Sequence, residues 1–527
     1  MSNRTIARAG IIVSGAFLVS RVLGWVRLVV IGNAFGATAE LDAFIAAFRI
    51  PDLIFQLVAA GALSSALIPI LSELFAANEH AKAWRVVSTV TNLILIGLAV
   101  LASVVFVAAP ALVRVAIAPG FDAASQALTV DLTRIMLLSA TFLALGSVMT
   151  SVLNARSRFA SAAISPIVYN LAIIGAALFL APSLGVVGLA IGVVVGALGH
   201  MAVQFMPVRA LGFRWLPVID LGDPASRRAI ALMAPRAIGL GASQITFVVV
   251  TALATTLDVG AVTAFTVAFT LLQIPIGVVG VPLGVVLFPS LSRDVATGNL
   301  EEFAGLLTRA MRAIVFVMIP VAVLTALVRT EIVALLFGRF SAAIVELTAA
   351  TLLAFSFGLV AHALIAVLAR AFYARQDTLT PVLAAIGAVI VNTTLAVILL
   401  GPLGLPGVAL AIAFAAWLEA LALLILLWRQ VHGLGFAEVG SVAIRTGLAS
   451  AVAGVVGVGV RRVVGDVWLP DPMVGGLTAI PGLVATTVAV TAAFSLAFVA
   501  AALVLRITEL RSIVGLMIDA LRRPRSS

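Results

Sequence analysis

Three arginines stand inside long apolar stretches near the start of the chain. Arg21 and Arg27 are six residues apart in one stretch, and Arg49 lies in the next. An arginine at bilayer depth costs about 2.5 to 3.5 kcal/mol on insertion scales, so it normally faces water, a partner or an anionic ligand. Its planar guanidinium offers paired donors and keeps its charge when desolvated, which suits a diphosphate. The three arginines therefore predict a cavity that binds a diphosphate without a metal.

The spacing of the first two arginines limits how they can act together. In a helix, six residues give a rise of about 9 Å and a net rotation of about 120°, so the two side chains can flank one cavity at two depths. The alternative is that Arg27 snorkels to the interface while Asp42 or Asp52 neutralises Arg21. Asp42 and Asp52 are therefore candidates for a gating ion pair that forms in one conformation and opens in another.

Two further polar residues lie in apolar stretches of the second half of the chain. Glu419 and Asn392 form a candidate coupling site, because an intramembrane carboxylate can bind a proton or Na⁺. The alternative for Glu419 is a structural hydrogen bond. No metal or other cofactor is expected, and coupling to Na⁺ or to the membrane potential is left open.

The composition is that of an integral membrane protein. Of 527 residues, 63% are apolar and only 10% are charged, and the mean hydropathy is +1.24. Such a chain cannot cover itself with a polar surface in water. Long apolar runs without strand-like alternation favour helices over a barrel. About fourteen spans are predicted, at 9–35, 41–75, 86–109, 129–153, 160–181, 184–206, 228–256, 260–288, 307–327, 344–373, 379–399, 405–428, 440–460 and 476–506.

The chain repeats its own pattern about 220 residues apart. Ala43-Phe44-Ile45-Ala46-Ala47-Phe48 returns as Ala264-Phe265-Thr266-Val267-Ala268-Phe269, and Gly185-x-x-Gly188 returns as Gly404-x-x-Gly407. Two homologous apolar halves around a central site are typical of transporters. We expect an N-terminal lobe at 1–215, a C-terminal lobe at 216–430, two added helices at 431–506 and a basic amphipathic tail at 507–527.

Basic residues are distributed unevenly between the two sides of this arrangement. If the N-terminus is cytoplasmic, that side carries 23 Lys and Arg residues and the other side carries six. The positive-inside rule then predicts that both termini are cytoplasmic. The net charge of +10 is explained by this topology and does not call for nucleic acid. The pattern of the tail predicts either an amphipathic helix that lies on the membrane surface or basic residues that only anchor the C-terminus on the cytoplasmic side.

Proline and glycine mark the predicted bends. Pro51 and Pro275 lie within apolar spans, and an interior proline removes a helical hydrogen bond. Gly277 and Gly280 follow Pro275 at roughly helical spacing. They indicate either close helix packing or a hinge for a rocking transporter.

Four motifs stand out along the chain: Ser20-Arg21-Val22-Leu23-Gly24-Trp25-Val26-Arg27, Asp42-Ala43-Phe44, Pro51-Asp52-Leu53 and Phe372-Tyr373-Ala374-Arg375-Gln376-Asp377. Together they resemble the MurJ (MviN) lipid II flippase family. The resemblance covers essentially the whole chain. It implies the multidrug/oligosaccharidyl-lipid/polysaccharide (MOP) exporter fold, with two six-helix lobes and a lipid-tail groove at the two C-terminal helices. It ties Arg21, Arg27 and Asp42 to activity and makes Arg375 and Asp377 part of a cytoplasmic loop motif.

The resemblance also implies a function. The family moves undecaprenyl-diphosphate-linked peptidoglycan precursor (lipid II) from the inner to the outer leaflet of the bacterial cytoplasmic membrane by alternating access. A flippase of this kind makes and breaks no bond, so no enzyme activity is expected. The expected partners are this lipid, the membrane and proteins of a cell-wall synthesis complex, and no nucleic acid.

Two places depart from the family pattern. Where relatives often carry arginines, this chain has Phe55-Gln56 and Phe269-Thr270. Either Arg49 and the first-helix arginines suffice for lipid II, or the cargo is another polyprenyl-linked oligosaccharide. A cation-coupled drug exporter of the same superfamily is a further alternative. A polyprenyl-phosphate transferase would need clustered carboxylates for Mg²⁺, and a non-transporting scaffold would need no open cavity.

Overall fold

The computed structural model describes residues 3–58, 62–468 and 480–510, and the regular structure in these residues is entirely helical. The chain divides into two compact units, residues 1–263 and 264–527. Each unit is described by itself. Most of the predicted tail at 507–527 lies outside the described residues.

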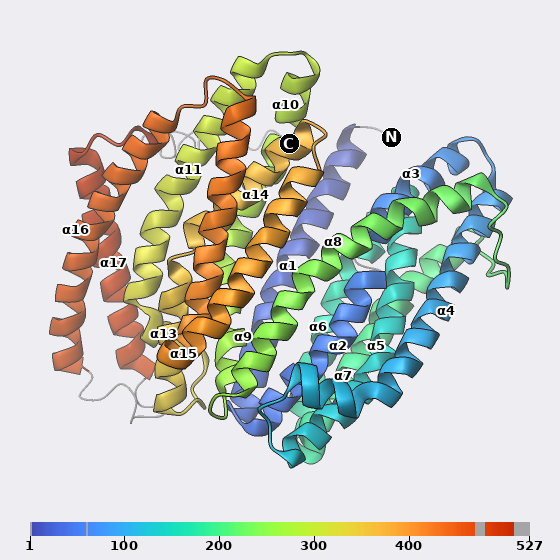
Figure 1. Ribbon diagram of the computed structural model, residues 1–527, viewed down its shortest axis with the longest axis horizontal. Coiled ribbons are helices and arrows are strands. Elements are labelled where there is room, and N and C mark those ends of the chain that lie inside the picture. Colours follow the sequence, from blue (N-terminus) through green and yellow to red (C-terminus); the bar gives the residue numbers. More distant parts are fainter. Residues whose placement is uncertain (1–2, 59–61, 469–479, 511–527) are drawn as a thin grey trace. The chain divides into compact units, whose positions relative to one another are not determined.

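The first unit is built around one central helix. Its helical segments are α1 (Asn3–Phe35), α2 (Ala39–Val58), α3 (Ala62–Ala76), α4 (His80–Leu112), the π-helical turn η1 (Val113–Ile117), α5 (Ala123–Ala155), α6 (Phe159–Phe179), α7 (Ala181–Ala210) and α8 (Pro224–Thr255) (Figure 1). Helix α5 packs against α2, α3, α4, α6 and α7, and α1 packs on α6. Helix α8 packs on α2 and α3, although the sequence repeat assigns it to the second lobe. The predicted lobe boundaries stay a prediction.

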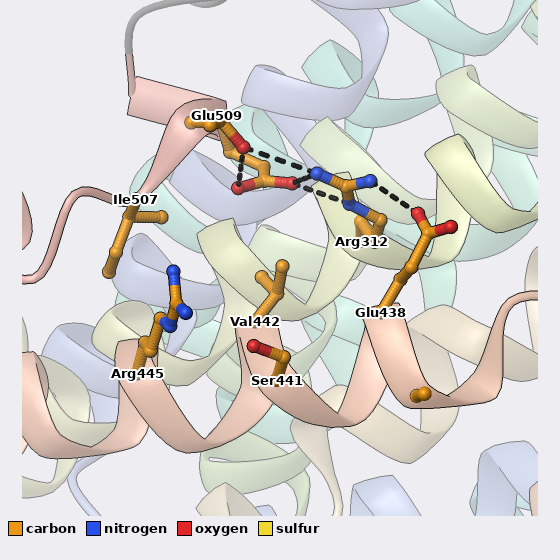
Figure 2. Close-up of a pocket in the computed structure, with 9 residues that line it drawn as sticks. Arg312, Glu438, Ser441, Val442, Arg445, Ile507 and Glu509 are labelled. Atoms are coloured by element: carbon orange, nitrogen blue, oxygen red, sulfur yellow. Dashed lines mark hydrogen bonds and ion pairs between the residues drawn. The ribbon is translucent and has the colours of Figure 1, made fainter.

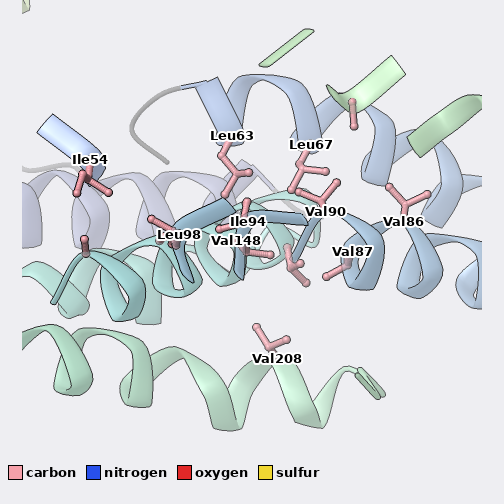
Figure 3. Packing of buried hydrophobic residues seen from close by; sticks show 14 of the residues in the cluster. Ile54, Leu63, Leu67, Val86, Val87, Val90, Ile94, Leu98, Val148 and Val208 are labelled. Atoms are coloured by element: carbon pink, nitrogen blue, oxygen red, sulfur yellow. The ribbon is translucent and has the colours of Figure 1, made fainter. Parts of the chain in front are cut away.

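The main core of the first unit lies where α3, α4 and α5 meet. Figure 3 shows Leu63 and Leu67 of α3 over Val90 and Ile94 of α4, with Val148 of α5 beside them, and all five are buried. Between membrane helices the attraction comes from van der Waals packing, since lipid chains are as apolar as these side chains. Close interdigitation of these side chains therefore holds this part of the bundle together.

The second unit pairs its last two helices side by side. Its segments are α9 (Ala261–Pro275, which begins at the end of the first unit), the π-helical turn η2 (Ile276–Gly280), α10 (Val281–Ala296), α11 (Leu300–Leu327), α12 (Arg329–Leu336), α13 (Ala342–Ser356), α14 (Leu359–Ala374), α15 (Leu379–Gln430), α16 (Phe436–Trp468) and α17 (Ile480–Val504). Helix α16 packs extensively on α17 and also on α11 (Figure 1). Helices α13 and α14 both pack on α15.

The predicted spans coincide with helices wherever the structure describes them. In the described residues ten helices are long and apolar enough to cross a membrane, or eleven if α13 and α14, bent by 47°, form one span. The number is below fourteen for three reasons. Helix α15, with 52 residues, holds the two spans predicted at 379–399 and 405–428, and α2 and α3 divide the span predicted at 41–75. Of the span predicted at 228–256, only Gln244–Thr255 counts as an apolar helix, and it is too short to cross. The all-helical membrane fold class is confirmed.

The internal repeat recurs in the backbone itself. Gly185 within α7 and Gly404 within α15 both break the helix, with φ of 58° in each and ψ of −144° and −142°. Residues with positive φ recur at the same offsets of 219 to 221, as the pairs Asn78 and Gly298, Ser157 and Gln376, Gly185 and Gly404, and Gly212 and Gly433. Equivalent turns in the two halves therefore have the same handedness.

Substituting Gly404 with alanine tests this break. Its φ and ψ lie where a side chain costs about 1 to 3 kcal/mol, and a Cβ there meets no atom within 4 Å. The expected result is a melting temperature in detergent several degrees below that of the parent protein. Gly401, in the same helix and equally open, is the matched control. Gly401→Ala should leave the melting temperature unchanged or slightly raised, because alanine favours a helix; equal losses in both variants would contradict a backbone cause.

Candidate functional site

Arg27 reaches from α1 to the neighbouring helix α6. Its guanidinium carbon lies 5.8 Å from the ring centroid of Tyr169, a cation–π contact worth about 0.5 to 2 kcal/mol. The chain has only two tyrosines. The other, Tyr373 of α14, lies within electrostatic reach of Arg370 and Glu419. The sequence analysis did not single out Tyr169; the scarcity of tyrosine is the signal that could have found it.

Arg49 joins α2 to α8. Its Nε donates a hydrogen bond of 2.9 Å to Oγ1 of Thr251, and its guanidinium carbon lies 5.6 Å from the ring centroid of Phe247. Asp52, one helical turn further along α2, interacts electrostatically with Arg49. Thr251 and Phe247 come from a helix two hundred residues away, so no local pattern could have indicated them.

Asp52 connects the two arginines. Its carboxylate accepts a hydrogen bond from the side chain of Gln56 and interacts electrostatically with Tyr169. We call Arg27, Arg49, Asp52 and Tyr169 the arginine cluster. It brings α1, α2 and α6 together, and α8 joins through Arg49.

The charge of the arginine cluster suits an anion. The cluster holds two guanidinium groups and one carboxylate, and of the two only the Arg49 guanidinium interacts electrostatically with Asp52 in the described residues, which leaves an excess of one positive charge among apolar helices. An anion that entered would replace Asp52 as the partner of an arginine. Arg21 lies apart from these contacts: it is exposed, and its guanidinium carbon lies 5.0 Å from the ring centroid of Phe17 on the same helix. The cluster therefore contains two of the three predicted arginines.

Replacing Thr251 with valine tests the link between α2 and α8. The change keeps the shape of the side chain but removes the acceptor of a hydrogen bond from a charged donor, so about 1.5 to 3 kcal/mol of stability should be lost. Thermal unfolding in detergent measures the effect. Thr256→Val is the control, because the exposed Thr256 hydroxyl bonds only to the carbonyl of Leu253 at the end of the same helix. A loss no larger than that of the control would contradict the link.

Asp42 is buried and caps the start of α9. Its carboxylate accepts hydrogen bonds from the backbone N–H of Gly260 (2.7 Å), the backbone N–H of Thr263 (2.8 Å) and the Thr263 hydroxyl (2.6 Å). A carboxylate at a helix N-terminus is favoured by the unpaired N–H groups and the helix dipole. Thr263 is also the residue equivalent to Asp42 in the sequence repeat, 221 residues on. In this conformation Asp42 holds backbone donors, and its predicted pairing with an arginine stays a prediction.

The predicted hinge residues lie at a change of helix type. Pro275 ends α9, and the π-helical turn η2 that follows contains Gly277 and Gly280. Pro51 is buried within α2. A π-helical turn interrupts the regular hydrogen-bond ladder and often marks functional positions. The hinge itself stays a prediction.

The candidate coupling residues lie on α15, on either side of the break at Gly404. Asn392 is buried, and its Oδ1 has no hydrogen-bond partner among the described residues. Glu419 is partly buried and interacts electrostatically with Tyr373. In the part of the chain that the structure describes, no hydrogen bond joins these two side chains, and no three His, Cys, Asp or Glu residues gather as metal ligands.

The loop motif closes the turn between α14 and α15. Asp377 accepts hydrogen bonds from the backbone N–H and the hydroxyl of Thr380, at 2.9 and 2.6 Å. These bonds lower the pKa of the Asp377 carboxyl. Arg375 lies two residues before it, and its Nε is buried without a partner among the described residues. The motif therefore sets the start of α15.

The two places that depart from the family pattern hold uncharged side chains with local partners. Gln56 donates to Asp52, and the Thr270 hydroxyl donates to the carbonyl of Thr266 on its own helix, at 2.7 Å. Phe269 stacks on Phe265 with ring centroids 6.0 Å apart. Neither place adds a cation.

These features define a multi-pass membrane protein of the MOP exporter fold. A solved structure titled "Lipid II flippase MurJ, inward closed conformation" is similar, with a TM-score of 0.74 and 22% identity over 92% of this chain and 98% of that one. An inward-facing MATE family transporter of the MOP superfamily is similar with a TM-score of 0.64 and 16% identity, over 80% of this chain and 95% of that one. At these identities both likenesses show the fold.

The chain belongs to the MurJ family. Residues 31–476 match the family model described as "Lipid II flippase MurJ". The "Lipid II flippase MurJ" of Burkholderia cenocepacia is 36% identical over 426 residues, which cover 79% of this chain and 82% of that protein. The "Probable lipid II flippase MurJ" of Rhizobium tropici is 35% identical over 432 residues, which cover 80% and 81%.

Proposed function

We propose that this protein moves lipid II from the inner to the outer leaflet of the bacterial cytoplasmic membrane by alternating access, for cell-wall synthesis. Membership of the family supports this reading. The observation that carries it is the gathering of Arg27 and Arg49 around Tyr169 and Asp52 inside an apolar bundle.

The arginine cluster supplies the binding chemistry of this proposal. Arg27 and Arg49 would each donate paired hydrogen bonds to the diphosphate, which replaces Asp52 as their counter-ion. Arg21, six residues earlier on α1, would meet the same head group at another depth. The sugars would cross with the diphosphate while the prenyl chain stays in lipid. No bond is made or broken, so the protein would need no catalytic residue and no cofactor.

Energy coupling and topology belong to the same proposal. Glu419 and Asn392 are the residues we propose for coupling to Na⁺ or to the membrane potential, since both are polar groups on a membrane-spanning helix. Both termini would be cytoplasmic, as the 23 to 6 division of basic residues predicts. Partners would be lipid II and proteins of a cell-wall synthesis complex, and not nucleic acid.

One observation favours a second cargo. Gln56 and Thr270 stand where the family resemblance leads us to expect arginines, and both are satisfied by local hydrogen bonds. A less cationic site suits another polyprenyl-diphosphate-linked oligosaccharide that carries fewer acidic groups than lipid II. A cation-coupled drug exporter fits less well, because it would favour buried acids over arginines.

Translocation in proteoliposomes tests the proposal. The protein is reconstituted with fluorescent lipid II, and a membrane-impermeant reductant bleaches the label in the outer leaflet. We expect protein-dependent bleaching of the inner-leaflet pool at least tenfold faster than for the same glycan on a polyprenyl monophosphate. Equal rates would contradict diphosphate recognition. Movement of a different polyprenyl diphosphate but not of lipid II would select the second cargo.

A further inference from the structure

A polar pocket lies at one end of the second unit and shares no residue with the arginine cluster. It is a cavity of about 410 Å³ between α11, α16 and the segment that follows α17 (Figure 2). The proposed transport uses none of its residues. Four charged side chains line it, Arg312, Arg445, Glu438 and Glu509.

One end of the pocket has an excess of negative charge. Arg312 donates to Glu438 at 2.6 Å and to Glu509 at 2.6 Å, and also to the hydroxyl of Thr508 at 3.2 Å. One guanidinium therefore serves two carboxylates, which leaves a net charge of −1. These bonds also tie α16 and the segment after α17 to α11.

The other end of the pocket is positive. Arg445 is exposed and makes no ion pair with the residues that the structure describes. Figure 2 shows its guanidinium rising beside Ile507, on the side of the pocket opposite Glu438, with Ser441 and Val442 between them. The pocket as a whole is neutral, with a positive and a negative end.

The depth of the pocket matches the head-group region of a bilayer. On α16 fifteen uncharged residues, 446–460, separate Arg445 from Arg461, and this corresponds to about 22 Å of helix. Sixteen uncharged residues, 313–328, separate Arg312 of α11 from Arg329 at the start of α12, or about 24 Å. At the far end Arg461 pairs with Glu331 at 2.7 Å. Polar groups at both ends of an apolar stretch of this length lie near the two membrane interfaces, because a stretch shorter than the core of about 30 Å is matched by local thinning of the bilayer and by snorkelling of its flanking side chains.

We propose that this pocket binds the phosphoethanolamine head group of a membrane phospholipid. The phosphate would pair with Arg445 and accept a hydrogen bond from Ser441, and the ammonium would donate to Glu438 and Glu509. An anionic phosphoglycerol head group lacks the ammonium and would meet the excess carboxylate. A phosphocholine head group carries the charge but cannot donate a hydrogen bond. Val442 and Ile507 offer an apolar surface to the glycerol end.

Fluorescence from a single label tests the proposal. The chain has no cysteine, so Ala437→Cys places one small environment-sensitive dye on the exposed Ala437 at the pocket wall. Dihexanoyl phosphatidylethanolamine, phosphatidylcholine, phosphatidylglycerol and inorganic phosphate are titrated against the detergent-solubilised protein. We expect saturable binding of phosphatidylethanolamine at a half-saturation at least tenfold below those of the other three. The shift in melting temperature of the unlabelled protein with the same lipids is a second, independent measurement of binding that does not use the dye.

Two variants locate the binding. Arg445→Gln should raise the half-saturation for phosphatidylethanolamine at least tenfold. Arg429→Gln, which changes an exposed arginine at the end of α15 outside the pocket, should leave it unchanged. Equal binding of phosphatidylglycerol or phosphate would show a simple anion site, and equal binding of phosphatidylcholine would show that the ammonium is not recognised. Either result would overturn the proposal, and so would the absence of saturable binding in both the fluorescence and the thermal-shift measurements.

Discussion

Replacing Arg27 with alanine is expected to abolish growth of flippase-depleted cells that rely on this protein. Arg27 supplies one of the two guanidinium groups of the arginine cluster and the cation of its contact with Tyr169. Without it Asp52 balances Arg49 alone, so the cluster loses its excess positive charge and its attraction for a diphosphate. Truncating one partner of a buried, hydrogen-bonded charge pair, as Arg27 would form with the diphosphate, typically costs about 2 to 5 kcal/mol, or about 30-fold to several thousandfold in affinity.

Complementation and reconstitution measure this loss together. The variant should reach the membrane in the parent's amount by immunoblot and should flip lipid II at least 30-fold more slowly in proteoliposomes. Arg27→Lys should recover part of the rate, because an ammonium keeps the charge but not the paired donors. Arg209→Ala, at an exposed arginine in the last turn of α7, should behave as the parent. Wild-type growth from Arg27→Ala would refute the diphosphate site.

Arg21 allows a graded comparison with Arg27. It lies outside the arginine cluster and stacks on a phenylalanine of its own helix. If it meets the head group at a second depth, Arg21→Ala should also prevent growth while leaving the melting temperature unchanged, because its one contact among the described residues is with Phe17 of its own helix. If cells carrying Arg21→Ala grow normally, Arg21 does not bind the head group, and the diphosphate site consists of Arg27 and Arg49.

The sequence predicted the helices and the repeat because both depend on local patterns. Apolar runs of spanning length are visible in any window, and a glycine that must adopt φ near 58° is constrained at Gly185 and Gly404 alike. The arginines were found because a charge in an apolar run stands out. Their contact partners could not be predicted, because Tyr169 and Thr251 lie near the arginines only as a result of how α6 and α8 pack.

The partner of Asp42 illustrates the same limit. An isolated acid near arginines suggests an ion pair, yet the carboxylate is occupied by backbone N–H groups at the start of α9. Nothing in the residues around Asp42 identifies a helix terminus more than two hundred positions away. Only the repeat offers a signal, since Thr263 is the equivalent of Asp42 in the second half.

Asp42→Ala is expected to lower stability more than any other single change at an acid in the first unit. It leaves the N–H groups of Gly260 and Thr263 without an acceptor in a buried place, and each such group costs about 1 to 3 kcal/mol. The loss should therefore be about 3 kcal/mol or more, with a clear fall in melting temperature in detergent. Asp42→Asn keeps one carbonyl acceptor and should lose less, and Thr263→Val, which removes a single hydroxyl bond, should lose least.

The exposed Asp258, in the same turn before α9, provides the matched control. Asp258→Ala removes an acid from the same segment, and no side-chain hydrogen bond of Asp258 is seen among the described residues. The melting temperature of this variant should therefore equal that of the parent. If the loss at Asp42 came from charge alone, Asp42→Asn would be as damaging as Asp42→Ala, and Thr263→Val would be silent. If the carboxylate caps α9, the loss of stability should be largest for Asp42→Ala, smaller for Asp42→Asn and smallest for Thr263→Val. A different order would contradict that role.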